Sequence, residues 1–254
     1  MTDATDAAAN FLVAARRSRL PGARLPEACR PVDATAAIAI QRRMTELLAL
    51  PIGGWKCSVP NAQRPVILAP IYATTIATGS PCPVTPIAGM ARIEPEVAFV
   101  IGRDLPPRDR PYTEAEIRAA IREPRLVLEL IGTRYADATA ASFPEILADG
   151  IANQGLYVGP AVPDALEQTL DVIPIEIDAA GQDTHAVSGK HPDGHPLLPL
   201  LWLANYLAQH DTGLRAGQIV TTGSYCGVVD VPLDTPLTVR FGMLGSLAVR
   251  FTQE

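Results

Sequence analysis

Three glutamates lie in or beside apolar segments, where an isolated carboxylate is costly to bury. Glu94 and Glu96 open the run "RIEPEVAFVIG" at 92–102, and Glu129 lies within "RLVLELIG" at 125–132. Residues two apart in a strand point to the same face, so Glu94 and Glu96 would repel each other beside a buried surface. One shared divalent cation would neutralise all three. Oxygen-only ligands favour a hard ion, Mg²⁺ or else Mn²⁺ or Ca²⁺, and the lack of an adjacent His or Cys argues against zinc.

The glutamate pair has a simpler interpretation as well. Glu94 and Glu96 could line a solvent-facing strand edge, where Pro95 between them is tolerated and charged alternation is common. Glu129, in a second apolar run, adds moderate support to the shared site and leaves this alternative open. The spacing of the carboxylates is thus suggestive of a metal centre without being diagnostic of one.

Lys56 is the second candidate for chemistry, because it stands alone between Trp55 and Cys57 in "GGWKCSV". Partial burial lowers the pKa of a lysine and lets it exchange protons near neutral pH. Carboxylates nearby would oppose that shift, so a catalytic Lys56 is expected to stand several ångströms beyond the glutamates. The alternative is a surface lysine whose stem covers Trp55.

Two further segments have less specific signals. In "TTGSYCGVVDV", Ser224 and the backbone N–H groups around it could hold a carboxylate, although a plain strand–turn–strand corner fits equally well. "GKHPDGHPL" is rich in Gly and Pro and is expected to be a loop. We expect residues 183–196 to form a mobile lid at the mouth of a pocket, with low individual weight on His191 and His195.

The elements that must position these residues follow from hydrophobic periodicity and from Gly and Pro breaks. Two amphipathic helices at 4–19 and 34–50, the second capped by Asp33, precede a β-rich remainder. This pattern predicts an α+β fold, with a small helical N-terminal region at 1–80 and a β-rich domain of mixed sheets at 81–254. Further helices are expected at 113–122 and 197–210, and strands at 92–102, 125–132, 155–162, 172–178, 218–222, 236–241 and 246–252.

Composition limits the function classes. The chain has 254 residues, 48% of them hydrophobic and 19% charged, which is enough for a large core. A net charge of −6 gives no basic surface for nucleic acid, and no apolar run approaches the roughly 20 residues that a membrane helix needs. The four scattered cysteines form no CxxC pair, and the acidic start is unlike a secretory signal. We therefore expect a cytoplasmic protein with reduced thiols.

Taken together, the motifs resemble the 2-keto-4-pentenoate hydratase family, in the hydratase and decarboxylase branch of the fumarylacetoacetate-hydrolase-like superfamily. The similar segments follow in family order over nearly the whole chain. They are "AARRSRLPGARLP", "AIAIQRRM", "GGWK", "IEPEVAFVIGRDL", "VLELIGTRY", "GHPLLPLLWLANYLA", "LRAGQIVTTGS" and "FGMLGSLAVRF". The combination is far more specific than any single motif.

The resemblance implies a fumarylacetoacetate-hydrolase-like fold and a role for each candidate residue. It implies Mg²⁺ or Mn²⁺ ligation by Glu94, Glu96 and Glu129, acid–base chemistry by Lys56, and a place for Ser224 near the substrate carboxylate. The family's Asp-Asn pair is Asp149-Gly150 here, which removes one side-chain amide unless Asn153 or Gln154 replaces it. Its "KIGLTS" segment is "KCSVPN" here, which reshapes one wall of the pocket.

The implied activity is a lyase reaction in the catabolism of aromatic compounds. Water is added to 2-hydroxypenta-2,4-dienoate, or to a related 2-oxo or 2-hydroxydienoic acid, to give 4-hydroxy-2-oxopentanoate. A homo-oligomer is also expected, with no nucleic-acid or membrane partner. The alternatives are a metal-dependent decarboxylase of the 4-oxalocrotonate type and a non-catalytic paralogue. Hydrolysis of a fumarylacetoacetate-like diketone is disfavoured. That branch of the superfamily resembles a design in which a histidine on the N-terminal side of the metal motif activates water, and here no histidine precedes residue 185.

Overall fold

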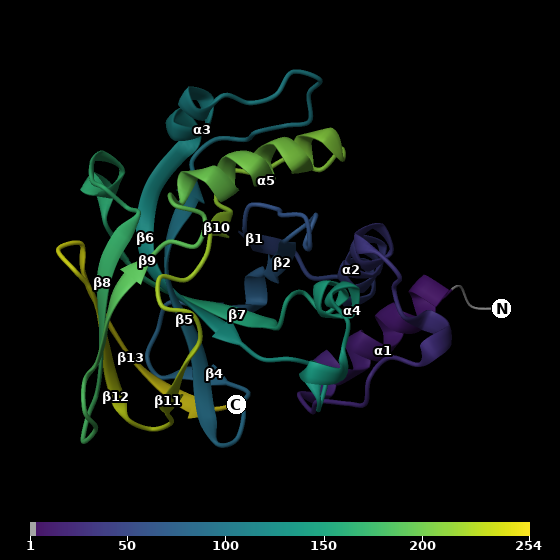
Figure 1. Ribbon diagram of the computed structural model, residues 1–254, viewed down its shortest axis with the longest axis horizontal. Helices are drawn as coiled ribbons and strands as arrows, with labels where there is room; N and C mark the ends of the chain where they lie inside the picture. Colours follow the sequence, from purple (N-terminus) through teal and green to yellow (C-terminus); the bar gives the residue numbers. More distant parts are fainter. Residues whose placement is uncertain (1–3) are drawn as a thin grey trace.

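The computed structural model describes residues 4–254, which form two β-sheets with helices packed around the larger one (Figure 1). The described helices are α1 (Ala4–Ser18), α2 (Ala34–Leu48), α3 (Glu114–Ala120), α4 (Phe143–Ala148) and α5 (Leu197–Gln209). The larger sheet comprises β1 (Ile52–Cys57), β2 (Leu68–Tyr72), β3 (Ile76–Ala77), β5 (Met90–Ile101), β6 (Ile121–Ile131), β7 (Asn153–Ala161), β10 (Ile219–Thr221) and β11 (Val229–Pro232). The smaller sheet comprises β4 (Cys82–Val84), β8 (Val172–Ala179), β9 (His185–Lys190), β12 (Pro236–Phe241) and β13 (Gly245–Gln253).

The larger sheet is mixed, in the order β2-β1-β10-β5-β6-β7-β3, with β11 paired to β5. Its centre is antiparallel, because β5 pairs with both β10 and β6, whereas β1 and β10 run parallel. The smaller sheet has the order β4-β13-β12-β8-β9. Its inner face packs on one face of β5 and β6, where Ile93, Val97 and Leu128 lie fully buried among residues of β8, β12 and β13.

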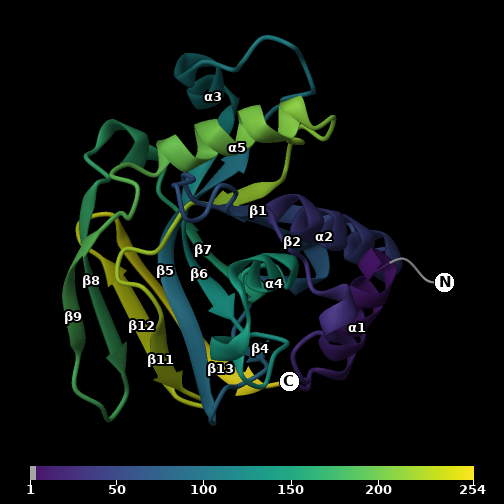
Figure 2. The ribbon, with the colours of Figure 1, turned by 45° about the vertical axis from the view of Figure 1, so that its right-hand side comes forward.

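The helices pack in two places on the molecule. Figures 1 and 2 both show α1, α2 and α4 together on one side, with the smaller sheet on the other. Asp33 caps α2 by accepting the backbone N–H of Ala36 at 2.8 Å, as its position before the apolar-periodic run predicts. Leu12 of α1 and Ile40 of α2 share one buried core with Trp55 of β1. The second group, α3 and α5, packs across the far end of the larger sheet (Figure 1).

The predicted α+β class with mixed sheets is confirmed, and so are the long periodic elements. The loop expected at 183–196 is wrong in part, because residues 185–190 form β9, an edge strand paired with β8. Short α4 and strand β11 were also not predicted. The division at residue 80 stays a prediction, although β1, β2 and β3 join the larger sheet from the N-terminal side of it. Within residues 4–254, no helix is both long and apolar enough to cross a bilayer.

Candidate functional site

Strand alternation turns the three glutamates away from the core between the sheets. Ile93 and Val97 point into that core, so Glu94 and Glu96 point to the opposite face of β5. Glu129 lies opposite Glu94 in the β5–β6 register and faces the same way. Like charges directly opposite each other destabilise an antiparallel pair of strands. Two opposed glutamates are therefore unusual at the centre of a sheet.

The structure brings the carboxylates of the three glutamates to within 4.8 Å of one another. Glu96 and Glu129 are almost completely buried, and Glu94 is half-buried. Burial, reinforced by the charge of Glu129, raises the pKa of Glu94 to about 7. Burial with the charges of Glu129 and Glu94 raises the pKa of Glu96 to about 8. The cluster therefore resists holding three negative charges unless a positive charge joins it.

Backbone donors fix the orientation of Glu96. Its Oε2 accepts the N–H groups of Thr222 and Gly223, each at 2.9 Å, from the turn that follows β10. Gly223 has a φ of 126°, and a Cβ there would come within 2.7 Å of Pro192. Glycine is therefore required at this position, and the turn holds the Glu96 carboxylate in place.

Lys56 lies in the cluster itself, so the expected separation from the glutamates is wrong. Its Nζ donates to Glu129 Oε1 at 2.5 Å and to the carbonyl of Ile151 at 3.1 Å. Burial lowers the pKa of Lys56, but the charges of Glu129 and Glu94 outweigh burial and raise it. The reason is electrostatic: a buried ammonium is stable only beside an opposite charge, and the carboxylates supply it.

Asn153 reaches the cluster, and Gln154 does not. Asn153 Nδ2 donates to Glu129 Oε1 at 2.9 Å, whereas the Gln154 amide bridges the backbone of Thr85 and Ile131. Of the two residues that could replace the side-chain amide lost at Asp149-Gly150, only Asn153 therefore lies at the cluster. Ser224 lies beside β5, where its hydroxyl contacts the carbonyls of Pro95 and Gly227 at 3.3 and 3.0 Å.

His191 received little weight from the sequence, but it lies beside Gly223 in the turn that holds Glu96. It is buried, and its Nε2 lies within 3.6 Å of the position that a Cβ on Gly223 would occupy. Burial lowers the pKa of His191 to about 4 despite the neighbouring Asp193. Asp193 in turn accepts Ser58 Oγ at 2.8 Å and the Val59 N–H at 2.9 Å. Residues 191–193 are therefore tied to the loop after β1, a contact with no local signature in sequence.

The donor set fits a hard divalent cation. Glu129 Oε2 is buried and has no hydrogen-bond partner among residues 4–254, which leaves one carboxylate oxygen free for a ligand bond. Two ligands of one Mg²⁺ lie at most about 4.2 Å apart, and two ligands of Ca²⁺ at most about 5 Å. The carboxylate oxygens of Glu94, Glu96 and Glu129 lie within 4.8 Å of one another, so small side-chain adjustments would let them share one ion of either size.

Comparison with known proteins gives a consistent group of relatives, although no family model matches the chain. It is 29% identical over 251 residues to a 2-keto-4-pentenoate hydratase of Paraburkholderia phymatum, with 94% of each chain covered. It is also 29% identical over 163 residues to the 2-keto-4-pentenoate hydratase of Paraburkholderia xenovorans, where the match covers 63% of this chain and 58% of the relative. A 2-oxo-hept-4-ene-1,7-dioate hydratase of Escherichia coli is 30% identical over 167 residues, covering 63% of this chain and 61% of that protein.

Solved structures share the fold. The 4-oxalocrotonate decarboxylase of Pseudomonas putida G7, complexed with magnesium and adipate, superposes with a TM-score of 0.77 at 21% identity, covering 99% of this chain and 98% of that one. Fumarylpyruvate hydrolase of Pseudomonas aeruginosa, complexed with Mn²⁺ and pyruvate, gives a TM-score of 0.51 at 16% identity, with 81% and 91% covered. At these identities the likeness establishes the fumarylacetoacetate-hydrolase-like architecture alone.

Proposed function

The chain belongs to the 2-keto-4-pentenoate hydratase family, and from this premise we propose that it is a divalent-metal-dependent hydro-lyase. Its proposed reaction is the addition of water to 2-hydroxypenta-2,4-dienoate or a related dienoate, giving 4-hydroxy-2-oxopentanoate or its homologue. The observation that carries the proposal is the convergence of Glu94, Glu96 and Glu129 with Lys56 in one buried site.

The three glutamates are the proposed ligands of Mg²⁺ or Mn²⁺. Relatives of the same fold were solved with magnesium, calcium or Mn²⁺, which supports a divalent ion without selecting one. When bound, such an ion supplies Lewis-acid stabilisation of negative charge on the 2-oxo acid. The backbone N–H groups of Thr222 and Gly223 orient Glu96, and the Asn153 amide orients Glu129.

Lys56 is the proposed proton carrier for the substrate carbons. Hydration needs a proton delivered to carbon while water adds at C4, and Lys56 is the one basic side chain whose charged atom contacts the carboxylates among the described residues. Its three N–H donors exceed the two contacts it makes with Glu129 and Ile151. One donor position is therefore available to a substrate.

Asn153 and Ser224 are the proposed substrate-binding residues. The Asn153 amide has an acceptor oxygen as well as the donor used on Glu129, so it can also orient a substrate hydroxyl or water. Ser224 would have to rotate its hydroxyl away from the carbonyls of Pro95 and Gly227 to donate to a substrate carboxylate.

The test is a Mg²⁺-supplemented assay that compares two substrates. With 2-hydroxypenta-2,4-dienoate, the dienol absorbance should decay without release of carbon dioxide. With 4-oxalocrotonate, carbon dioxide release would support the decarboxylase alternative instead. Inactivity with both substrates, together with no Mg²⁺ binding by calorimetry, would support a non-catalytic paralogue.

Cellular setting and assembly are part of the proposal. A cytoplasmic location is supported by the four cysteines, all of them free thiols. We also propose a homo-oligomer, for which sedimentation of the purified chain is the direct measurement.

A further inference from the structure

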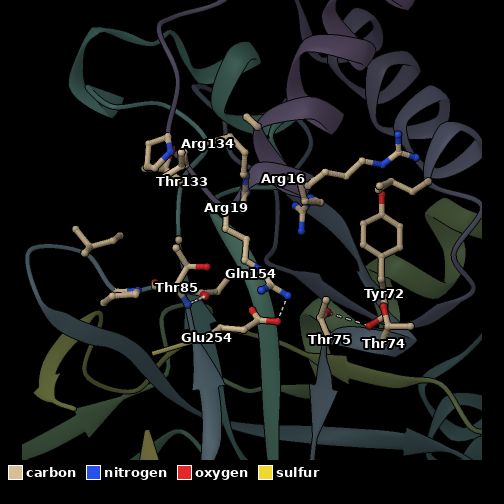
Figure 3. Close-up of a pocket in the computed structure, with 18 of the residues that line it drawn as sticks. Arg16, Arg19, Tyr72, Thr74, Thr75, Thr85, Thr133, Arg134, Gln154 and Glu254 are labelled. Atoms are coloured by element: carbon tan, nitrogen blue, oxygen red, sulfur yellow. Dashed lines mark hydrogen bonds and ion pairs between the residues drawn. The ribbon is translucent and has the colours of Figure 1, made fainter. Parts of the chain in front are cut away.

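A second polar site lies apart from the glutamate cluster, at the end of α1. Here a cavity of about 320 Å³ opens between the loop after α1, the segment after β2 and the segment after β6. We call it the arginine pocket and define it by Arg16, Arg19, Tyr72, Thr74, Thr75 and Arg134 (Figure 3). None of the three clustered glutamates lines this pocket. Its volume is at the lower end of the range for small-molecule sites.

Positive charge predominates in the arginine pocket. Arg16, Arg17, Arg19 and Arg134 line it, whereas Glu254 supplies one carboxylate, which pairs with Arg19. Arg134 is held by Asp149 and by the carbonyl of Asn153, so its charge is fixed and partly compensated. The arginines outnumber the carboxylates, and the pocket has a positive field that suits an anion.

Arg16 offers the unused donor. One N–H group contacts the carbonyl of Asn153 at 3.2 Å, and the guanidinium lies 5.5 Å from the centre of the Tyr72 ring. Its Nε is buried and has no hydrogen-bond partner within residues 4–254. Figure 3 shows Arg16 directed toward the middle of the pocket, between Arg19 and Tyr72. Burial and the charge of Arg134 also lower the pKa of Arg16 to about 10, so an anion beside it would be stabilising.

The rest of the lining selects among anions. Leu48, Leu50, Pro86 and Ile87 add apolar surface to the pocket. A guanidinium edge binds a carboxylate through two parallel hydrogen bonds, and apolar walls favour a ligand with a hydrocarbon body. We propose that the arginine pocket binds a small organic carboxylate, with Arg16 on the carboxylate group and the apolar wall on the body. This inference does not depend on the reaction proposed for the glutamate cluster.

Benzoate is a suitable probe, tested by isothermal titration calorimetry on the full chain with Mg²⁺ at low ionic strength. Arg16→Met should raise the benzoate dissociation constant at least tenfold, because a charged hydrogen-bond pair is lost. Thr74→Trp changes an exposed wall residue and should block the pocket to a similar extent without removing charge. Arg240→Met, on the exposed face of the smaller sheet, is the matched control and should leave binding unchanged. Glu96→Gln should also leave benzoate binding unchanged.

Three outcomes would overturn the proposal. Wild-type benzoate binding in both Arg16→Met and Thr74→Trp would place benzoate elsewhere, for instance at the glutamate cluster. Equal binding of benzyl alcohol would show that the site does not recognise a charge. Tighter binding of inorganic phosphate than of benzoate would assign an inorganic anion in place of an organic carboxylate. A melting temperature for Arg16→Met close to that of the wild type separates loss of binding from loss of fold.

Discussion

Lys56 is paired so directly with Glu129 that its removal should separate catalysis from metal binding. Lys56→Met keeps the stem and deletes the proton carrier, so turnover should fall by roughly 10²–10⁴-fold. Mg²⁺ should bind with equal or higher affinity, because the ammonium at 2.5 Å competes with a cation for the Glu129 carboxylate. Stopped-flow turnover and Mg²⁺ calorimetry measure the two effects.

The control for this variant is Lys190→Met, at the only other lysine of the sequence, which is exposed on β9. It should leave turnover unchanged. Near-normal turnover in Lys56→Met would show that Lys56 serves only as a structural counter-charge. Water or an acidic side chain would then have to carry out the proton transfers.

The raised pKa values of Glu94 and Glu96, about 7 and 8, predict how stability depends on pH once divalent ions are chelated. The folded state holds protons on these groups that the unfolded state has released, so stability falls as pH rises from about 5 to 8. Urea unfolding in EDTA at several pH values should show this slope. Glu96→Gln should flatten it, and Mg²⁺ should restore stability at high pH. A rise in stability over the same window without divalent ions would contradict the expected ionisation.

At the scale of elements, α4 is held by an internal carboxylate. Glu145 is fully buried, accepts two N–H groups of Arg24 at 2.9 and 2.6 Å, and closes a capping box with Ser142. Burial acts to raise the pKa of Glu145, but the hydrogen bonds from Arg24 and Ser142 outweigh it and lower the pKa to about 2. Its stabilising contribution is therefore complete above about pH 5 and is lost as pH falls toward 2.

Glu145→Gln should lower the free energy of unfolding at pH 7 by about 1–3 kcal/mol, because it breaks a charged network around a buried group. The difference from the wild type should shrink between pH 5 and 3. Urea titrations at these pH values measure it. Glu46→Gln, on an exposed pair with Arg43, should cost less than about 1 kcal/mol and serves as the control. A constant difference across the pH range would mean that the lost contacts do not depend on ionisation.

The elements that could be predicted from sequence are those with long periodic patterns. Strand β5 and helix α5 match the expected segments closely, since 12 and 13 residues of consistent burial leave little ambiguity. Strand β9 could not be predicted, because most of its residues are exposed and it forms only by pairing with the edge of β8. The contact between Lys56 and Glu129 was also missed. It depends on parallel pairing of β1 with β10, which no local pattern encodes.

At the scale of the whole molecule, the helical N-terminal region and the β-rich remainder share one core. Trp55 of β1 lies in the same buried cluster as residues of α1, α2 and α5, and Trp202 of α5 packs against that cluster. We therefore expect one cooperative unfolding transition across the predicted boundary at residue 80.

The chain has two tryptophans, so each can report separately. Trp202→Phe leaves Trp55 as the reporter for the N-terminal side, and Trp55→Phe leaves Trp202 for the C-terminal side. Each variant's fluorescence curve should coincide with its own far-ultraviolet circular dichroism curve during urea unfolding. Separated curves would show two parts that unfold independently, as a true domain division at residue 80 would require.

Asn153 connects the arginine pocket to the glutamate cluster. Its backbone carbonyl accepts hydrogen bonds from Arg16 and Arg134, while its side-chain amide donates to Glu129. One residue therefore contacts both the arginine pocket and the glutamate cluster. If a ligand drew Arg16 away from that carbonyl, we expect the position of Asn153, and with it the hydrogen bond to Glu129, to change. Thermodynamic linkage then makes the effect reciprocal: the factor by which benzoate changes Mg²⁺ affinity must equal the factor by which Mg²⁺ changes benzoate affinity. A coupling free energy measured in both directions by calorimetry would give the same value twice, and a value of zero would make the two sites independent neighbours.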